Sequence, residues 1–185
     1  MIEFDATALV VVDVQKGFDQ SDYWGPRNNP ACEENIAVLI TAWRARGGPI
    51  VYVRHDSITP GSPFQPGTPG NALRDFVNGE PDLLVVKHVN SAFHGEPDLH
   101  AWLTERGVGS LALCGVQTNH CVETTARMAA DLGYEVLFVL DATHTFDRAG
   151  PDGTVLTADE LARATATSLH GEVATVVGTN DLLPE

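Results

Sequence analysis

Short apolar runs alternate along the chain with longer segments whose apolar residues recur at helical spacing. The first run, Ala8–Val14, is almost continuous and rich in valine, as expected of a strand that is covered on both faces. Together with the later runs it predicts six strands, at Ala8–Val14, Ile50–Arg54, Leu83–His88, Ser110–Cys114, Glu135–Leu140 and Val173–Val177.

The segments between these strands predict helices. In Glu34–Arg46 the apolar residues follow the i, i+3, i+4, i+7 spacing of a single helix face. Further helices are predicted at Leu99–Arg106, at Asn119–Leu132 and after the capping-box pattern Thr157–Glu160. Such alternation requires right-handed crossovers. We therefore predict one α/β domain over residues 1–185, with three α/β/α layers and a six-stranded, mainly parallel, Rossmann-like sheet.

The segment between His55 and Asp82 differs from the rest of the chain. It is rich in proline and glycine and shows neither strand nor helix periodicity. A connection of this length in a compact domain is usually functional or a subunit contact. We expect substrate specificity to lie in its central part, Ile58–Gly79, and in the contacts that this part makes across subunits.

Composition and charge narrow the range of partners. The 185-residue chain carries a formal net charge of -14 and has no cluster of lysine and arginine, which argues against nucleic acid and against an anionic membrane surface. No apolar stretch approaches the ~20 residues of a membrane span. The N-terminus lacks a basic region before its apolar run, and the three cysteines form no C-x-x-C pair. A cytoplasmic protein is predicted.

Three predicted strands end in residues that can carry chemistry. Asp13 closes the first strand, Lys87 closes the third, and Cys121 follows the fourth in the first turn of the next helix. Ligands of open α/β sheets bind beyond the carboxyl ends of the strands, so these side chains are expected to meet there. A carboxylate can take the proton of a thiol, and an ammonium and a helix N-terminus both lower a thiol pKa from its usual value of about 8.5.

Each of these residues also has an ordinary structural interpretation. Asp13 could be a turn residue, Lys87 a solvated edge residue and Cys121 an inert small apolar residue, as we expect of Cys32 and Cys114. The combination of the three is more specific than any one of them. His120, next to Cys121, would be a poor base for it, since consecutive helical side chains diverge by ~100°. The spacing of His88, His94 and His100 fits neither a helix face nor a zinc site.

The same residues lie in recognisable motifs. DVQKGF after an apolar strand, a lysine followed by SAF, the stretch CGVQTNHCVETTARMAADLGYEV and a later VLDAT resemble the isochorismatase-like cysteine hydrolases, which include nicotinamidases and N-carbamoylsarcosine amidases. The resemblance implies Asp13 as base and acid, Lys87 as its electrostatic partner and Cys121 as nucleophile. It also implies a cis peptide between Val116 and Gln117, which would aim the Gln117 and Cys121 N–H groups at an oxyanion.

The resemblance further implies a homo-oligomer, dimer or tetramer, and an aromatic pocket wall at Phe18, to which we add Trp24, His55 and Phe93. The Asp-x-His motif that holds a metal in nicotinamidases is missing, because His55 and Asp56 stand in the wrong order. We therefore predict no metal and no cofactor, and we place nicotinamide low among substrates. The segment His94–Pro97 also departs from the family pattern and alters the pocket wall.

The predicted function is hydrolysis of a C–N bond in a small non-peptide amide or carbamoyl compound through a thioester. Two alternatives stay open. One is an isochorismatase-type hydrolase of an enol ether, although true isochorismatases lack the nucleophilic cysteine that Cys121 would be. The other is a module that binds a small molecule or supports assembly without turnover.

Overall fold

The computed structural model describes residues 2–77 and 79–183 and contains a six-stranded sheet in the order β3-β2-β1-β4-β5-β8. All five pairings between neighbouring strands are parallel, which confirms the predicted Rossmann-like sheet. The strands are β1 (Thr7–Val12), β2 (Ile50–His55), β3 (Leu83–Lys87), β4 (Ser110–Val116), β5 (Glu135–His144) and β8 (Thr175–Val177). The strand order reverses between β1 and β4, which makes their carboxyl ends the expected place for a ligand.

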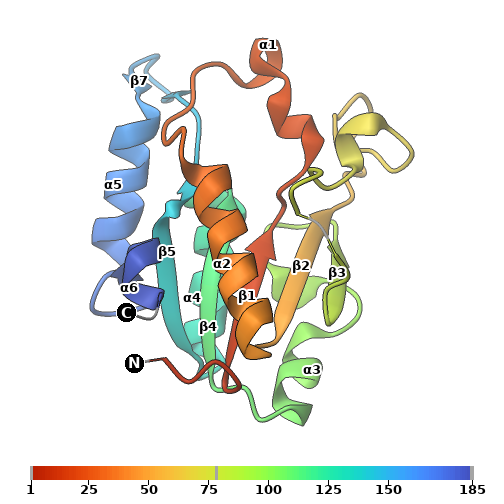
Figure 1. Cartoon of the computed structure of the whole chain (residues 1–185). Helices are drawn as coiled ribbons and strands as arrows, with labels where there is room; N and C mark the ends of the chain where they lie inside the picture. The colour runs from red at the N-terminus through yellow and green to blue at the C-terminus, as the bar shows by residue number, and fades with distance from the viewer. Residues whose placement is uncertain (1, 78, 184–185) are drawn as a thin grey trace.

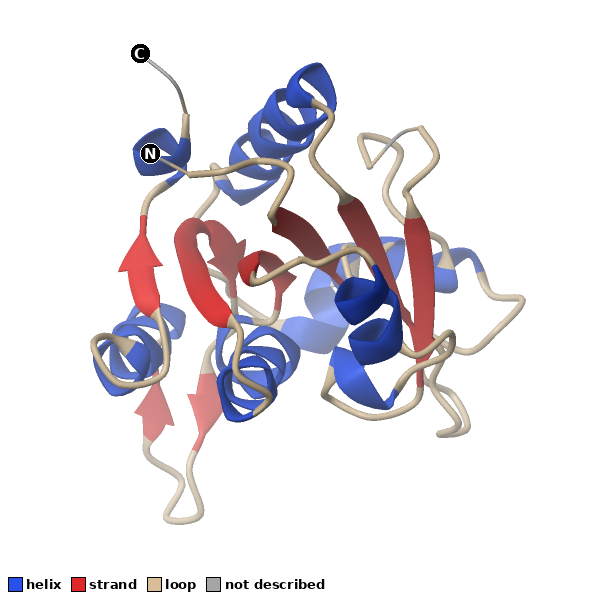
Figure 2. Ribbon diagram, turned by 90° about the horizontal axis from the view of Figure 1, so that it is seen from below, coloured by secondary structure: helices blue, strands red, loops and turns tan. Residues whose placement is uncertain are grey.

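Helices cover both faces of the sheet (Figures 1 and 2). One face packs against α2 and α6, and the other packs against α3, α4 and α5. The helices are α1 (Ser21–Trp24), α2 (Cys32–Arg46), α3 (Leu99–Glu105), α4 (Glu123–Asp131), α5 (Ala158–Leu169) and α6 (Thr179–Leu182). Short helical turns are η1 (Lys16–Asp19), η2 (Pro69–Asn71), η3 (Ala92–His94) and the π-helical turn η4 (Thr118–Val122).

Burial on both faces explains the unbroken apolar sequence of β1. All six residues of the strand are buried. Leu9 and Val11 join the core beneath α2, whereas Val10 and Val12 join the core beneath α3 and α4. Trp43 of α2 is fully buried, and its indole N–H donates to a backbone oxygen of β1 at 2.9 Å. Apolar packing therefore holds α2 against the strand that leads to Asp13.

The ends of several elements differ from the prediction. β1 ends at Val12, so the predicted end at Val14 is wrong, and Asp13 is the first residue beyond the strand. The predicted helix Asn119–Leu132 is split, because its first turn has π geometry and regular α-helix begins only at Glu123. Side-chain periodicity does not distinguish a π turn from an α turn, and the sequence therefore carried no signal for it.

The strand β5 continues four residues past its predicted end, to His144. Its pairing with β4 is irregular: Phe138 faces Leu113, but Thr143 already faces Gly115. The bulged segment contains Asp141. Aspartate is uncommon in strand interiors, so the sequence pattern indicated that the strand ends before this residue. Side-chain amides of α2 and of the loop before it bind the backbone oxygens of this bulge.

Loops at the carboxyl ends of the strands gather on one side of the molecule, at the top in Figure 1. They include α1, residues 56–74 after β2 and a hairpin of two short antiparallel strands, β6 (Arg148–Ala149) and β7 (Val155–Leu156). Strands of two residues are too short to give a period, and the hairpin was not predicted.

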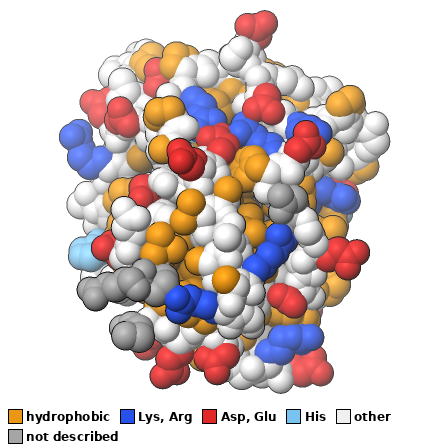
Figure 3. Space-filling model, viewed as in Figure 1, with side chains coloured by type: hydrophobic (Ala, Val, Ile, Leu, Met, Phe, Trp, Pro, Cys, Tyr) orange, Lys and Arg blue, Asp and Glu red, His pale blue; other side chains and the backbone are white. Residues whose placement is uncertain are grey.

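Acidic side chains are scattered over the face shown in Figure 3, with cations dispersed between them and no continuous basic patch. This distribution agrees with 25 acidic against 11 basic residues. Within residues 2–77 and 79–183, no helix has both the length and the apolar content needed to cross a bilayer.

Candidate active site

Asp13 lies at the carboxyl end of β1, in a backbone conformation that is uncommon for a side-chain-bearing residue. Its φ is 51°, in the left-handed region, which aspartate tolerates better than most residues do. Its N–H donates to the Val53 oxygen at 2.9 Å, and its carbonyl accepts the Gln15 N–H at 2.8 Å. The side chain is buried beneath this turn, and the fold therefore determines where the carboxylate points.

Lys87, the last residue of β3, is fully buried and lies against three acceptors. Its Nζ is 2.6 Å from Asp13 Oδ2, 3.4 Å from Cys121 Sγ and 3.4 Å from His55 Nδ1. An ammonium has three donors, so these contacts account for all of them. The structure thus brings together the three residues predicted from separate strand ends, which we call the Asp–Lys–Cys cluster (Asp13, Lys87 and Cys121).

Cys121 is held in the π turn η4 by contacts to the neighbouring loop. The hydroxyl of Thr125 donates to the Cys121 carbonyl at 2.7 Å and accepts the Ala92 N–H at 3.1 Å. Ala92 follows Lys87 in the chain, so one hydroxyl couples the loop after β3 to the turn that carries the thiol. The Cys121 side chain is partly exposed, whereas Cys32 and Cys114 are buried.

Gly115 allows β4 to approach β1 immediately before Asp13. Its φ is +119°, and a Cβ atom there would lie 2.1 Å from the carbonyl oxygen of Val12. No side-chain-bearing residue fits this position without movement of the backbone. The close approach aligns the end of β4, and therefore the turn that holds Cys121, with the carboxylate of Asp13.

The electrostatics of the cluster correct one expectation. Burial and the negative charge of Asp13 raise the pKa of Cys121 to about 12, and the nearby Lys87 only partly offsets them. Burial lowers the pKa of Lys87, but Asp13 and Cys121 outweigh it and the net shift is upward. The lowered thiol pKa expected from the sequence is therefore wrong for the free protein, since the degree of burial could not be deduced from the sequence. The resting state pairs an ammonium with a carboxylate beside a neutral thiol.

His55 belongs to this cluster as an acceptor. Burial and the charge of Lys87 lower its pKa, so the ring is neutral at pH 7, and Nδ1 can accept from the ammonium. Its backbone is clamped by Gln15, which accepts the His55 N–H at 2.8 Å and donates to the His55 oxygen at 3.0 Å. The same Gln15 amide donates to the Asn71 oxygen at 2.8 Å and so ties the segment 56–82 to the site.

Four aromatic rings pack beside the Asp–Lys–Cys cluster and form what we call the aromatic cluster: Phe18, Trp24, Phe64 and Phe146. The centroid of Phe18 lies 5.0 Å from that of Trp24 and 4.6 Å from that of Phe64. Phe64 also meets the ring of His55 edge-on at 6.2 Å, which joins the two clusters. Flat apolar walls of this kind suit a small ligand.

The predicted pocket residues are only partly brought together. Phe18 and Trp24 share the aromatic cluster and His55 contacts its edge, but the ring of Phe93 stacks on Tyr134 at 5.9 Å instead. Sequence reasoning missed Phe64 and Phe146. Phe64 comes from the aperiodic segment after β2 and Phe146 from the loop after β5, where no pattern marks a residue as buried.

The peptide bond between Val116 and Gln117 is cis, and Gln117 leads into η4. The π-type hydrogen bonds of the turn begin at Val122, whose N–H donates to the Gln117 oxygen at 3.3 Å. The N–H of Cys121 lies one residue before this first bond. The Gln117 side chain is bound separately, because its Oε1 accepts from Arg148 Nη2 at 3.1 Å.

Asp56 is occupied by structural contacts. Arg54 forms two hydrogen bonds with its carboxylate, at 2.7 and 3.0 Å, and Asn71 donates a third at 2.9 Å. His88 Nδ1 lies 2.6 Å from the Asp56 carbonyl oxygen. In the described ranges 2–77 and 79–183, no group of three or more His, Cys, Asp or Glu residues is arranged to hold a metal ion.

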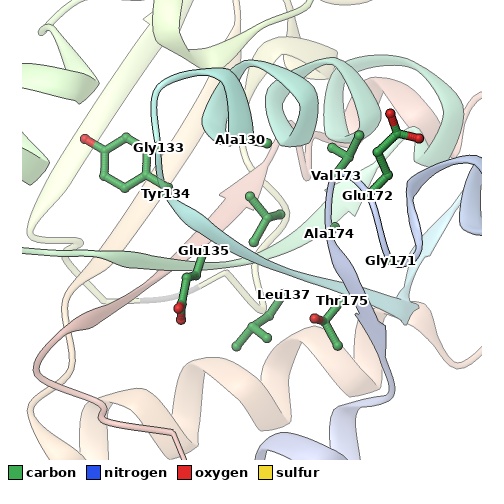
Figure 4. A pocket seen from close by; sticks show the side chains of 11 residues that line it. Ala130, Gly133, Tyr134, Glu135, Leu137, Gly171, Glu172, Val173, Ala174 and Thr175 are labelled. Atoms are coloured by element: carbon green, nitrogen blue, oxygen red, sulfur yellow. The ribbon is translucent and has the colours of Figure 1, made fainter.

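A surface hollow of about 540 Å³ opens far from this chemistry (Figure 4). It lies between the amino-terminal parts of β5 and β8, whereas the Asp–Lys–Cys cluster lies at carboxyl ends. Its polar lining includes Tyr134, Glu135 and Glu172. Of these, Tyr134 hydrogen-bonds to His100 and Glu135 accepts from Ser110, so neither carries a free reactive group.

The fold and this arrangement define a Rossmann-like α/β protein with a carboxylate, an ammonium and a thiol clustered near the point where the strand order reverses. Residues 7–170 match the isochorismatase domain family. The chain is 36% identical over 177 residues to an uncharacterized isochorismatase family protein, YrdC, of Bacillus subtilis, with 95% of this chain and 94% of that protein covered.

Two further relatives extend the comparison. A putative hydrolase of the isochorismatase family from Chromobacterium violaceum has a solved structure that superposes with a TM-score of 0.91 at 38% identity, covering 98% of this chain and 93% of the other. Nicotinamidase 3 of Arabidopsis thaliana is 31% identical over 163 residues, covering 80% of this chain and 78% of that protein. The chain therefore belongs to the isochorismatase family and is a hydrolase of that family, which confirms the resemblance drawn from its motifs.

Proposed function

We propose that this chain is a cysteine hydrolase that cleaves the C–N bond of a small non-peptide amide or carbamoyl compound through a thioester. One observation carries the proposal: the buried Lys87 Nζ lies 2.6 Å from Asp13 Oδ2 and 3.4 Å from Cys121 Sγ. These are the three groups that a thiol-based acyl transfer requires, namely a nucleophile, a base and a cation that keeps the base ionised. The likeness to Nicotinamidase 3, named for action on an amide, supports the same class of bond.

Asp13 acts as the base in this mechanism. Its Oδ2 is bound to Lys87, whereas its buried Oδ1 accepts no hydrogen bond of ordinary geometry from the described residues. Oδ1 is thus free to take the thiol proton. With the pKa of Cys121 near 12 in the free protein, the thiol transfers its proton as the sulfur attacks, rather than resting as a thiolate. Lys87 keeps its charge throughout, because its pKa is raised.

The reaction then proceeds in two halves. Cys121 Sγ bonds to the carbonyl carbon, and the N–H groups of Gln117 and Cys121 bind the resulting oxyanion. The C–N bond breaks as Asp13 returns its proton to the nitrogen, which releases ammonia or an amine. Asp13 next takes a proton from water, and the hydroxide attacks the thioester. The C–S bond breaks, the thiol regains its proton from Asp13, and a carboxylic acid leaves.

Ammonia release from a panel of small amides, ureas and carbamoyl compounds tests this function, with isochorismate as the enol-ether arm. We expect at least one C–N substrate to turn over and Cys121→Ala to abolish it. Cys114→Ala is the matched control, because Cys114 is buried within β4 and has no role in the reaction. Turnover of isochorismate alone, or full activity of Cys121→Ala on the amide, would overturn the proposal.

A further inference from the structure

Arg148 brings a positive charge to the approach to Cys121. It lies in β6 of the exposed hairpin, and its Nη2 donates to Gln117 Oε1 at 3.1 Å. Burial is the largest cause of the lowered pKa of His120, and the charge of Arg148 is the second. Gln117 and His120 both precede Cys121 within five residues of the chain, so the guanidinium lies beside the turn that leads to the thiol.

This arginine is not neutralised by the protein. Nearby cations at the same end of the sheet are ion-paired: Arg27 and Arg74 both bind Glu33, and Lys16 lies 2.6 Å from Asp75. Among the residues that the structure describes, Arg148 has no carboxylate within 4.0 Å, and its contact to Gln117 uses one of its five N–H donors.

The acidic side chains of the same hairpin form hydrogen bonds with other groups. Asp147 Oδ1 accepts the Ala158 N–H at 2.7 Å, and Asp152 binds the backbone and hydroxyl of Thr154. Arg46 and Arg163 of the described residues also lack a carboxylate within 4.0 Å, but Arg148 differs from them because it hydrogen-bonds to the segment that leads to Cys121. Its remaining donors form the planar fork that matches a carboxylate.

We propose that Arg148 binds a carboxylate on the acyl side of the substrate, so that the chain acts on small amides or carbamoyl compounds that are also acids. This inference rests on the proposed hydrolysis at Cys121. A net charge of -14 repels anionic substrates, and a cation without an ion-pair partner, bound to Gln117 at the start of the turn that holds Cys121, counters that repulsion. Neutral amides of the same size gain no such contact.

The rival role for Arg148 is a tether that only holds the hairpin against Gln117. The two roles differ in what they affect. A tether acts on all substrates alike, whereas a carboxylate-binding residue acts on KM and only for substrates that carry the negative charge.

The test compares each acid amide with its neutral diamide: oxamate with oxamide, malonamate with malonamide and succinamate with succinamide. Ammonia release gives kcat and KM for the wild type, Arg148→Gln, Arg148→Lys and the control Arg163→Gln, an exposed arginine of α5. We expect the wild type to prefer at least one acid amide. Arg148→Gln should reduce that preference by about ten- to hundredfold, mainly through KM, because a charge-assisted hydrogen-bond pair is lost. Arg148→Lys should retain part of the preference and Arg163→Gln all of it.

A second readout does not need turnover. Malonate and succinate, which contain no C–N bond, should bind the wild type more tightly than Arg148→Gln in calorimetry. If amides are hydrolysed without preference for the acid, or if Arg148→Gln slows both members of a pair equally, the carboxylate role is overturned and the hydrolase stands. If no amide is hydrolysed but the diacids bind through Arg148, the hydrolase proposal fails and the carboxylate role stands.

Discussion

Replacing Asp13 by Asn should make Cys121 more reactive toward an alkylating agent while abolishing catalysis. The change removes the negative charge and keeps the shape of the side chain. That charge is, after burial, the largest cause of the raised thiol pKa, and Lys87 opposes it. With the carboxylate neutralised and Lys87 in place, the thiol pKa falls. Lys87→Met should act in the opposite direction and raise it further.

The size of the effect follows from the thiol pKa of about 12. At pH 8 such a thiol is ionised in on the order of one molecule in 10⁴, whereas a free cysteine with a pKa of about 8.5 is ionised in about a quarter. The ionised fraction of Cys121 is therefore more than about a thousandfold smaller than that of free cysteine. A thiolate of higher pKa is the stronger nucleophile, so wild-type Cys121 should react on the order of a hundredfold more slowly than free cysteine. Each unit by which Asp13→Asn lowers the pKa raises the ionised fraction about tenfold and weakens the thiolate as a nucleophile, so the reaction should speed up about three- to fourfold.

Iodoacetamide labelling between pH 7 and 10, followed by mass spectrometry of the Cys121 peptide, measures this rate. Cys121→Ala reports any labelling of Cys32 and Cys114, both of which are buried. Slower labelling in Asp13→Asn than in the wild type would refute the electrostatic reasoning. So would wild-type labelling that follows an apparent pKa below 8.

Two further substitutions test the scaffold and its pH dependence. Gly115→Ala should destabilise the protein by about 2–5 kcal/mol in urea unfolding, because its Cβ would lie 2.1 Å from the Val12 oxygen at a φ of +119°. Gly109→Ala is the matched control, since a Cβ at Gly109 would meet nothing within 4 Å. Equal losses of stability in the two variants would contradict the close-approach argument. Burial, with help from nearby arginines, lowers the pKa of His144 to about 3, so the unfolded chain binds the extra proton as pH falls below its ordinary value of 6.5. The contribution of His144 to the free energy of unfolding is complete above pH 6.5 and should be about 2 kcal/mol smaller at pH 5. In urea unfolding at pH 7 and pH 5, His144→Phe should lose less stability between the two pH values than the wild type does. An unchanged pH dependence in this variant would contradict the assignment.

The sequence located the Asp–Lys–Cys cluster because its members stand at strand ends, and strand ends can be recognised from apolar runs. Parallel strands bring their carboxyl ends to one edge, so three residues far apart in the chain could be expected to meet. The parallel sheet with helices on both faces followed from the same alternation, whereas the order of its strands was not predicted. No comparable rule applies to Phe64, which lies in an aperiodic segment and is buried only because that segment folds back over η1.

Burial also explains why the thiol pKa was predicted in the wrong direction. The helix end and Lys87 are visible in the sequence and both lower a thiol pKa, but the extent of desolvation depends on the packing of the whole site. The same limit applies to Arg148. Its position in the chain does not reveal that a hairpin carries its guanidinium to Gln117, nor that the neighbouring acids are directed elsewhere.

Formation of a thioester at Cys121 is the step on which the proposed chemistry depends, and partitioning of the acyl group between water and hydroxylamine measures it most directly. For an amide and its N-methyl derivative, a shared acyl-enzyme predicts the same ratio of hydroxamate to acid at each hydroxylamine concentration, with both products lost in Cys121→Ala. A ratio that changes with the leaving amine, or unchanged products from Cys121→Ala, would contradict a thioester at this cysteine.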